Sequence, residues 1–195
     1  MNIAIFCGVF AGVMQVIGYW IYNKDVFTDP RRKPNAVSWG LWAFGSLLTS
    51  SSYAEVVHDW VKEILPFACV IACTLTFLAF LIKGKLGRPD KWEVAILILD
   101  LLILVFWVVT ESANWTNLLL MFSVAFSFIP NLRSVWKKPT TENPLPWFVW
   151  SFAYALLFLT VILRFEKWWD LAYPVTYFIL HFAVGLIAKF RTANL

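Results

Sequence analysis

Long apolar segments, separated by short stretches that contain charged residues, glycine or proline, dominate the pattern along the chain. Seven segments are long and apolar enough to predict helices: 3–22, 36–54, 64–82, 93–110, 115–130, 146–163 and 171–189. None of them alternates apolar and polar residues over its length, as the strands of a membrane barrel do. A lipid bilayer offers the backbone no hydrogen-bond partners, and about 20 apolar residues span it, so each segment predicts a transmembrane helix.

Composition supports this interpretation. Of the 195 residues, 61% are hydrophobic and only 14% are charged, whereas soluble domains contain roughly 25% charged residues. The chain has too few charges to cover a water-facing surface, which excludes an ordinary soluble enzyme, a disordered chain and a disulfide scaffold. The first segment lacks the basic leader and cleavage site of a signal peptide, so we expect it to be retained. The sequence therefore predicts an all-α integral membrane protein with seven spans.

The basic residues predict how the chain crosses the membrane. With seven spans, thirteen of the sixteen Lys and Arg residues lie at one end, and the other three are Lys62, Arg164 and Lys167. Since positive residues concentrate in cytoplasmic loops, we expect an external N-terminus and a cytoplasmic C-terminus in a multi-pass protein of the cell membrane. The thirteen residues are spread over short loops beside apolar helices. We therefore expect the lipid bilayer, not a nucleic acid, as their partner.

The two halves of the chain resemble each other at an offset of 108 residues. Tryptophan, asparagine and proline residues near the segment ends recur at this offset: Trp39 and Trp147, Trp42 and Trp150, Asn35 and Asn143, Trp60 and Trp168, Pro66 and Pro174. This pattern predicts a three-helix repeat at 1–87, a linker helix at 88–111 and a second repeat at 112–195. The linker span makes the repeats parallel, and transporters with such symmetry bind substrate between the repeats.

This three-plus-one-plus-three layout resembles the SWEET sugar transporters and the wider PQ-loop superfamily. That superfamily carries Pro-Gln at the cytoplasmic end of the first helix of each unit; here Pro130-Asn131 ends the fifth segment and Tyr22-Asn23 ends the first. The Trp-x-x-Trp pairs are also similar to those of PnuC-type vitamin-precursor transporters. Their motif continues to an Asn or Asp where this chain has Tyr154. The resemblance implies a uniporter or proton-coupled carrier for a small polar solute, such as a sugar, that works by alternating access.

Asp100 is the one charged residue near the middle of a predicted span. A carboxylate at the bilayer centre costs about 2.5–3.5 kcal/mol, so we expect Asp100 to be protonated or paired with a neighbouring helix. Three roles remain open for it. It couples transport to protons, anchors the substrate, or holds the linker helix to the bundle by a hydrogen bond.

His181 lies midway along the last segment, on the same helix face as Pro174 and Tyr177. A position at this depth is consistent with a cavity that binds a polar solute or carries a proton. A hydrogen bond from His181 to a neighbouring helix is an equally good explanation.

Most of the twelve tryptophans lie near segment ends, where such rings form interfacial belts. We assign Trp39 and Trp147 to these belts, whereas Trp42 and Trp150 lie about one turn deeper. Each of the deeper pair is followed four residues later by a hydroxyl residue on the same face. Aromatic faces with hydroxyl groups suit a sugar or a nucleoside-like ring, although helix packing explains them equally well. The predicted substrate-binding residues are Trp42, Ser46, Trp150, Tyr154, Tyr177 and His181.

Other features complete the prediction. Pro66, Pro130 and Pro174 are candidate flex points for alternating access, and the three cysteines are expected to act as small hydrophobes. No nucleotide-binding, metalloprotease or acyl-transfer motif appears, so we expect no enzyme activity, catalytic residue, cofactor or metal. The alternative function is a non-transporting PQ-loop-like membrane receptor or accessory subunit. A homo-oligomer also stays open, although a chain with both repeats has less need of one.

Overall fold

The computed structural model describes residues 2–29, 36–83 and 87–192. In these ranges the chain forms α-helices and two short 3-10 helices and contains no strand, which confirms the predicted all-α class. The helices are α1 (Ile3–Thr28), α2 (Ala36–Val57), α3 (Trp60–Ile82), α4 (Lys91–Thr110), α5 (Ala113–Lys137), η1 (Pro139–Thr141), α6 (Pro144–Leu163), η2 (Trp168–Leu171) and α7 (Ala172–Thr192).

Six helical segments have the length and apolar composition to cross a membrane: α1, α3, α4, α5, α6 and Trp168–Arg191, which comprises η2 and most of α7. They identify a multi-pass membrane protein. α2 is not among the six, because a run of hydroxyl residues from Thr49 to Ser52 lowers its hydropathy.

Asn and Asp residues define the start of several helices. Asn2, Asp59, Asp90 and Asn143 each accept a hydrogen bond from the backbone N–H two residues further on. Such caps contribute about 1 kcal/mol each, because they satisfy N–H groups that the helix leaves unpaired. They set the helix starts that the apolar pattern alone locates only approximately.

Two helices extend six or seven residues beyond their predicted ends, further than the others. α1 ends at Thr28 instead of residue 22, and α5 continues through Pro130 to Lys137. The prediction that the fifth helix ends at Pro130 is therefore wrong. An internal proline removes one backbone hydrogen bond but need not end a helix, and the turns beyond it carry Arg133 and Trp136, which suit a membrane interface. The apolar pattern marks the membrane core, whereas the helical backbone continues past it.

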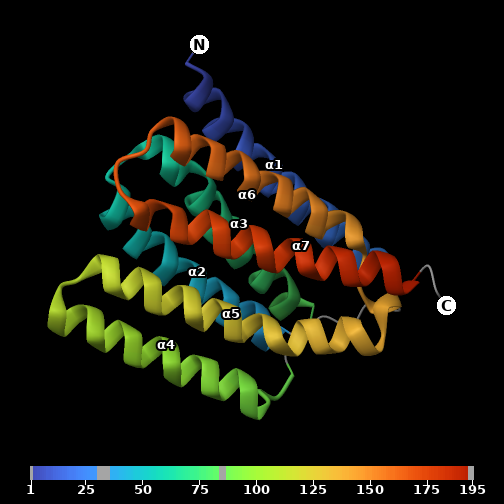
Figure 1. The fold of residues 1–195 in the computed structure, drawn as a ribbon. Helices are drawn as coiled ribbons and strands as arrows, with labels where there is room; N and C mark the ends of the chain where they lie inside the picture. The colour runs from blue at the N-terminus through green and yellow to red at the C-terminus, as the bar shows by residue number, and fades with distance from the viewer. Residues whose placement is uncertain (1, 30–35, 84–86, 193–195) are drawn as a thin grey trace.

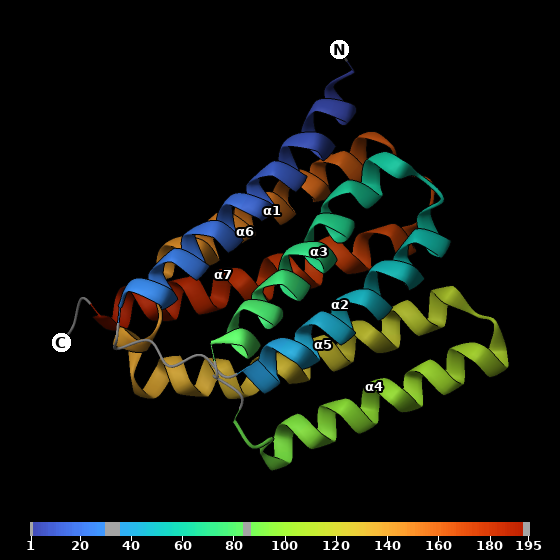
Figure 2. The ribbon, with the colours of Figure 1, turned by 180° about the vertical axis from the view of Figure 1, so that it is seen from behind.

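Six helices pack as a ring. α3 packs between α1 and α2, and α7 packs between α5 and α6. Contacts of α1 with α6 and of α2 with α5 close the ring, so its order is α1, α3, α2, α5, α7, α6 (Figure 1 and Figure 2). α4 lies outside the ring against α5 and α2.

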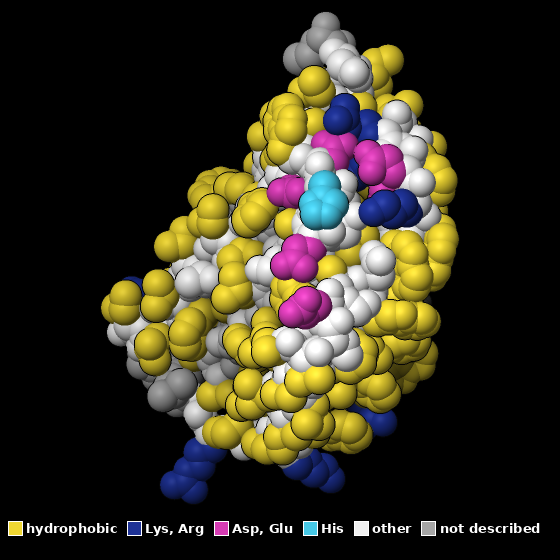
Figure 3. Space-filling model, turned by 90° about the vertical axis from the view of Figure 1, so that its left-hand side faces the viewer, with side chains coloured by type: hydrophobic (Ala, Val, Ile, Leu, Met, Phe, Trp, Pro, Cys, Tyr) yellow, Lys and Arg dark blue, Asp and Glu magenta, His cyan; other side chains and the backbone are white. Residues whose placement is uncertain are grey.

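The two ends of the bundle carry different charges. The α2–α3, α4–α5 and α6–α7 connections lie at one end, named here the acidic end, where Figure 3 shows acidic, basic and histidine side chains grouped within an apolar surface. Its charged residues are Glu55, Asp59, Lys62, Glu63, Glu111, Arg164, Glu166, Lys167 and Asp170. The opposite end, named the basic end, holds Lys24, Lys83, Arg88, Lys91, Arg133, Lys137, Lys138, Lys189 and Arg191. Arg31, Arg32, Lys33, Lys85 and Asn35 lie outside the described residues.

Between the two ends the outer surface is apolar, whereas part of the interior is polar. Val105, Val108 and Val109 of α4 are 60%, 71% and 75% exposed, as expected for side chains that face lipid. Buried polar side chains include Gln15, Ser46, Thr49, Asp100, Asn117 and Ser123. Because polar groups inside a membrane are costly, their concentration in the interior favours a functional site there.

Candidate functional site

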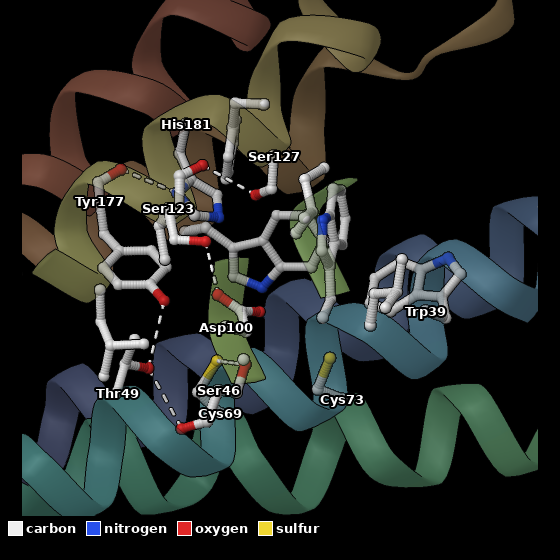
Figure 4. Close-up of a pocket in the computed structure, with 18 of the residues that line it drawn as sticks. Trp39, Ser46, Thr49, Cys69, Cys73, Asp100, Ser123, Ser127, Tyr177 and His181 are labelled. Carbon is white, nitrogen blue, oxygen red and sulfur yellow. Dashed lines mark hydrogen bonds between the residues drawn. The ribbon is translucent and has the colours of Figure 1, made fainter. Parts of the chain in front are cut away.

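A cavity lies inside the ring, and all seven helices contribute to its lining (Figure 4). One lining residue from each helix, in chain order, is Tyr19, Ser46, Cys69, Asp100, Ser123, Tyr154 and His181. The cavity volume that the centre of a water molecule can occupy is about 50 Å³. Since a buried water needs roughly 10–15 Å³ of such space, the cavity has room for a few waters in this conformation.

The residues predicted to bind substrate lie together in this cavity. Its lining includes Trp42, Ser46, Trp150, Tyr154, Tyr177 and His181. Asp100 lines the same cavity, so the two candidate proton carriers, Asp100 and His181, share one space.

None of the three candidate flex prolines is in the lining of this cavity, although Pro130 lines a second cavity described below. Pro66 and Pro130 are inside α3 and α5, where each removes a helix hydrogen bond. Pro174 lies in the first turn of α7, which follows η2 directly. A first-turn proline costs the helix no hydrogen bond, so Pro174 marks the start of α7 instead of interrupting it.

Cys69 connects several polar groups of the cavity. Its Sγ lies 3.4 Å from Tyr19 Oη and 3.9 Å from both Ser46 Oγ and Tyr154 Oη. Cys69 is buried, as expected of a small hydrophobe, and it also contacts three hydroxyl groups. Its residue type gave no signal of this, because the four groups come from four different helices.

Asp100 reaches the cavity from α4, outside the ring. Its side chain is buried, and its Oδ1 accepts a hydrogen bond from Ser123 Oγ at 2.5 Å. Its Oδ2 has no hydrogen-bond partner among the described residues; it lies toward α2, where a Cβ placed on Gly45 would be 3.5 Å away. No Lys or Arg appears among the described lining residues. The Asp100 carboxyl group thus has a hydroxyl partner but no cationic one in this part of the protein.

His181 lies inside an aromatic cluster. Its ring centroid is 5.1–5.9 Å from the ring centroids of Phe128, Trp147, Trp150, Tyr154 and Tyr177. Its Nδ1 lies 2.8 Å from the backbone oxygen of Tyr177. A carbonyl oxygen only accepts, so Nδ1 carries the proton, and in the neutral ring Nε2 is the acceptor.

Four tryptophans line the cavity, and the N–H groups of two of them are bonded elsewhere. Trp150 Nε1 donates to the Gln15 carbonyl at 3.3 Å, and Trp147 Nε1 donates to Glu142 Oε2 at 3.1 Å. Gly18 makes room for the Trp150 indole, since a Cβ on Gly18 would lie 2.4 Å from Nε1.

The assignment of Trp39 and Trp147 to the interfacial belt is wrong. Their side chains are only 3% and 1% exposed, and both line the cavity. The signal was present in the sequence, because the Trp-x-x-Trp spacing places each beside a deeper tryptophan on one helix face. Proximity to a segment end was a poorer guide than helix periodicity.

A second cavity, named here the vestibule, extends from the central cavity to the basic end. The two share Trp39, Leu41, Trp42, Ile96 and Ser127 in their lining. By the same measure the volume of the vestibule is about 280 Å³. Its lining is more polar than that of the central cavity and includes Ser38, Asp90, Glu93, Asn131, Ser134 and Glu142. The two cavities therefore adjoin, and the wider one lies at the basic end.

The acidic end is closed by ion pairs that join the two sides of the ring. Lys62 Nζ lies 2.7 Å from Asp170 Oδ2, and both side chains are fully buried. Arg164 Nε lies 2.5 Å from Asp59 Oδ2. This hydrogen bond raises the pKa of Arg164 above its usual range, because it stabilises the protonated guanidinium.

Two hydrogen bonds to backbone carbonyls lie beside these ion pairs. The ion pairs and these hydrogen bonds together are named here the closing network. Lys167 Nζ donates to the Val56 carbonyl at 3.3 Å, and Tyr53 Oη donates to the Asp170 carbonyl at 3.1 Å. Tyr53 also stacks on Tyr173, with ring centroids 4.8 Å apart. Hydrogen bonds and stacked rings thus seal the end opposite the vestibule.

Comparison with known proteins leaves function to be inferred from this geometry. No family model matches the chain, and neither a curated protein nor a solved structure matches it. In the described part of the chain, no group of three or more His, Cys, Asp or Glu residues is arranged to hold a metal ion.

Proposed function

We propose that the chain is a membrane carrier for a small polar solute, such as a sugar, and that it works by alternating access as a uniporter or proton-coupled carrier. The observation that carries this proposal is the central cavity, which is polar and aromatic, sealed at one end and continuous with a vestibule at the other. Polar side chains at membrane depth mark solute and ion pathways. The resemblance to the SWEET and PQ-loop transporters supports the same function.

In this proposal α2 is the seventh span. Its hydroxyl residues do not oppose this role, because Ser46, Thr49, Ser50 and Ser52 are all buried inside the bundle. The basic end is the cytoplasmic side, since positive residues concentrate there. The N-terminus is then external, and the vestibule opens toward the cytoplasm.

The ring order supports two parallel repeats, α1–α3 and α5–α7. Half a turn of the ring takes α1 to α5, α3 to α7 and α2 to α6. At the offset of 108, Lys62 is the counterpart of Asp170, and this offset separates the two residues of the buried ion pair. A residue that contacts its own counterpart must lie near the axis that relates the repeats.

A second contact supports the same axis. At the offset of 108, Asp59 corresponds to Lys167 and Val56 corresponds to Arg164, so the symmetry relates the Asp59–Arg164 contact to a Lys167–Val56 contact. Both contacts are present, at 2.5 Å and 3.3 Å. The closing network therefore joins the two proposed repeats around their axis, where separation of the repeats opens the external side.

Solute flux into liposomes that contain the purified protein tests this proposal. A panel of labelled sugars, polyols, nucleosides and organic cations is offered to protein-containing and protein-free vesicles. At least one solute should enter faster with the protein. No flux of any solute, together with no ligand-induced change in thermal stability, would contradict the carrier function.

Two tryptophan variants on adjacent positions of α2 link the flux to the cavity. Ser46→Trp fills the cavity and should abolish flux, because Ser46 is 7% exposed and lines it. Leu47→Trp is the matched control and should retain flux, because Leu47 is 50% exposed on the outside of the bundle. Equal flux in the two variants would place the pathway elsewhere.

A further inference from the structure

The hydrogen-bond balance of the central cavity indicates the class of solute. Most of its donors already have partners inside the protein: Tyr19 with Cys69, Thr49 with Tyr177, and Ser123 with Asp100. Two acceptors of the lining have no partner among the described residues, Asp100 Oδ2 and His181 Nε2; the indole N–H groups of Trp39 and Trp42 have none either. Since the first is a carboxyl oxygen and the second is the acceptor of a neutral imidazole, the cavity offers acceptors to a solute that donates or carries positive charge.

The aromatic lining favours the same kind of solute. Trp42 stacks on Phe128 with ring centroids 5.7 Å apart, and Trp147, Trp150 and Tyr154 surround the neighbouring space. The N–H groups of Trp147 and Trp150 are bonded elsewhere, so what these rings offer a solute is an electron-rich aromatic face and not a donor. A cation within about 6 Å of such faces is attracted to them, most strongly by tryptophan.

The Asp100 carboxyl group needs a positive partner when it is ionised. An unpaired carboxylate inside a membrane bundle is costly, and no Lys or Arg among the described lining residues neutralises it. A proton on Asp100 or a bound cation beside it removes this cost, and each excludes the other because both neutralise the same charge.

From these observations we propose that the solute is a small organic cation, exchanged against a proton on Asp100. The proposal rests on the carrier function proposed above and narrows its substrate class. Binding of a monovalent cation releases the Asp100 proton to water, and release of the cation lets the carboxylate take up a proton. One proton moves against one cation, so the exchange is electroneutral, driven by a pH difference and not by the membrane potential.

Other titratable groups share the cavity with Asp100. They are Tyr19 on α1, Cys69 and Cys73 on α3, Tyr154 on α6, and Tyr177 and His181 on α7. Helix α4 packs directly on α2 and α5. Neither α2 nor α5 contributes a titratable group to the described lining. His181 is the nearest chemical alternative to Asp100 as the proton carrier, so the test includes a variant of each.

The experiment uses liposomes loaded at a lower pH than the outside buffer, with the membrane potential clamped by potassium and valinomycin. The probes are labelled tetramethylammonium, choline and N-methylpyridinium, with glucose and ribose as neutral solutes. We expect uptake of at least one cation that collapses when the pH difference is removed. A pH difference of one unit should support about a tenfold cation gradient, because one proton is exchanged per cation.

Variants assign the exchange to Asp100. Asp100→Asn should reduce cation uptake by about thirtyfold or more, as loss of a buried charge partner does, while its amide oxygen still accepts from Ser123. Asp100→Glu should keep pH-driven uptake, as should Glu111→Gln, which changes an exposed carboxyl at the acidic end. His181→Gln should lower uptake but leave its dependence on the pH difference unchanged. Unfolding temperatures of all four verify folding.

The outcomes separate this proposal from the carrier function. Uptake of glucose or ribose without any cation uptake would overturn the cation class and leave the carrier standing. Cation uptake that persists in Asp100→Asn, or that follows the membrane potential, would overturn proton exchange on Asp100. Absence of flux for every probe would overturn this proposal. If no solute of the wider panel is transported either, the carrier function itself is overturned.

Discussion

Removal of the Lys62 charge should open the acidic end of the cavity. Lys62 and Asp170 form a fully buried ion pair with an Nζ–Oδ2 distance of 2.7 Å, and this pair joins α3 to the segment before α7. Lys62→Met keeps a side chain of similar length but removes the charge. Asp170 is then a buried carboxylate without its cation in the closed conformation.

The size of the effect follows from the burial of the pair. Loss of one partner of a buried ion pair costs about 3–5 kcal/mol, because the remaining charge stays uncompensated. Water reaches Asp170 when the end opens, so the cost falls mainly on the closed conformation. At about 1.4 kcal/mol per factor of ten, the ratio of open to closed molecules should rise by roughly a hundredfold or more.

Cys69 and Cys73 provide the assay, because both line the cavity and neither is in a disulfide. In a Cys7→Ala background, a membrane-impermeant maleimide applied to intact cells should label Lys62→Met much faster than the parent protein. The double variant Lys62→Met/Asp170→Leu should label slowly again, since an apolar pair of similar size can replace a buried ion pair. Lys167→Met is the comparison within the same network: Lys167 is exposed and donates only to a carbonyl, so its loss should raise the labelling rate far less. Equal labelling rates in folded Lys62→Met and parent protein would refute the closing role of the pair.

Three further predictions address packing, the cavity and pH. Gly18→Ala should destabilise the protein by about 1–3 kcal/mol, because its Cβ would lie 2.4 Å from Trp150 Nε1, whereas Gly45→Ala should be nearly neutral with its nearest atom at 3.5 Å; equal unfolding temperatures would contradict this. His181→Phe should lower solute flux while the protein stays folded, since the ring keeps its aromatic neighbours but loses Nε2; unchanged flux would remove His181 from the binding site. The raised pKa of Arg164 means that its stabilising contact is fully present below the usual arginine pKa and is lost only above it. Unfolding temperatures of the parent and Arg164→Gln should therefore differ by the same amount at pH 7 and pH 9, and a difference that shrinks over this range would contradict it.

Helix periodicity and depth were enough to predict much of the cavity. Trp42, Trp150, Tyr154 and His181 lie on inward faces because residues three, four or seven apart share a helix face. Their depth then placed them at a similar level in the membrane. This reasoning works for residues on one helix, since it needs no knowledge of which helices are neighbours.

Features that depend on the helix order could not be predicted in this way. The Cys69 contacts and the closing network each join side chains from three or more elements, and their partners follow only from the order α1, α3, α2, α5, α7, α6. Lys62 and Asp170 lie near segment ends, where charged residues are ordinary loop residues. Their separation of 108 was a usable signal, because it equals the repeat offset.

Solute counterflow tests the central claim, a carrier with alternating access, most directly. Liposomes that contain the protein are preloaded with an unlabelled solute from the panel and diluted into a trace of the same labelled solute. The account predicts a transient accumulation of label above its equilibrium level, which Ser46→Trp abolishes and Leu47→Trp retains. Label that only equilibrates, with no overshoot for any transported solute, would contradict alternating access and indicate a channel.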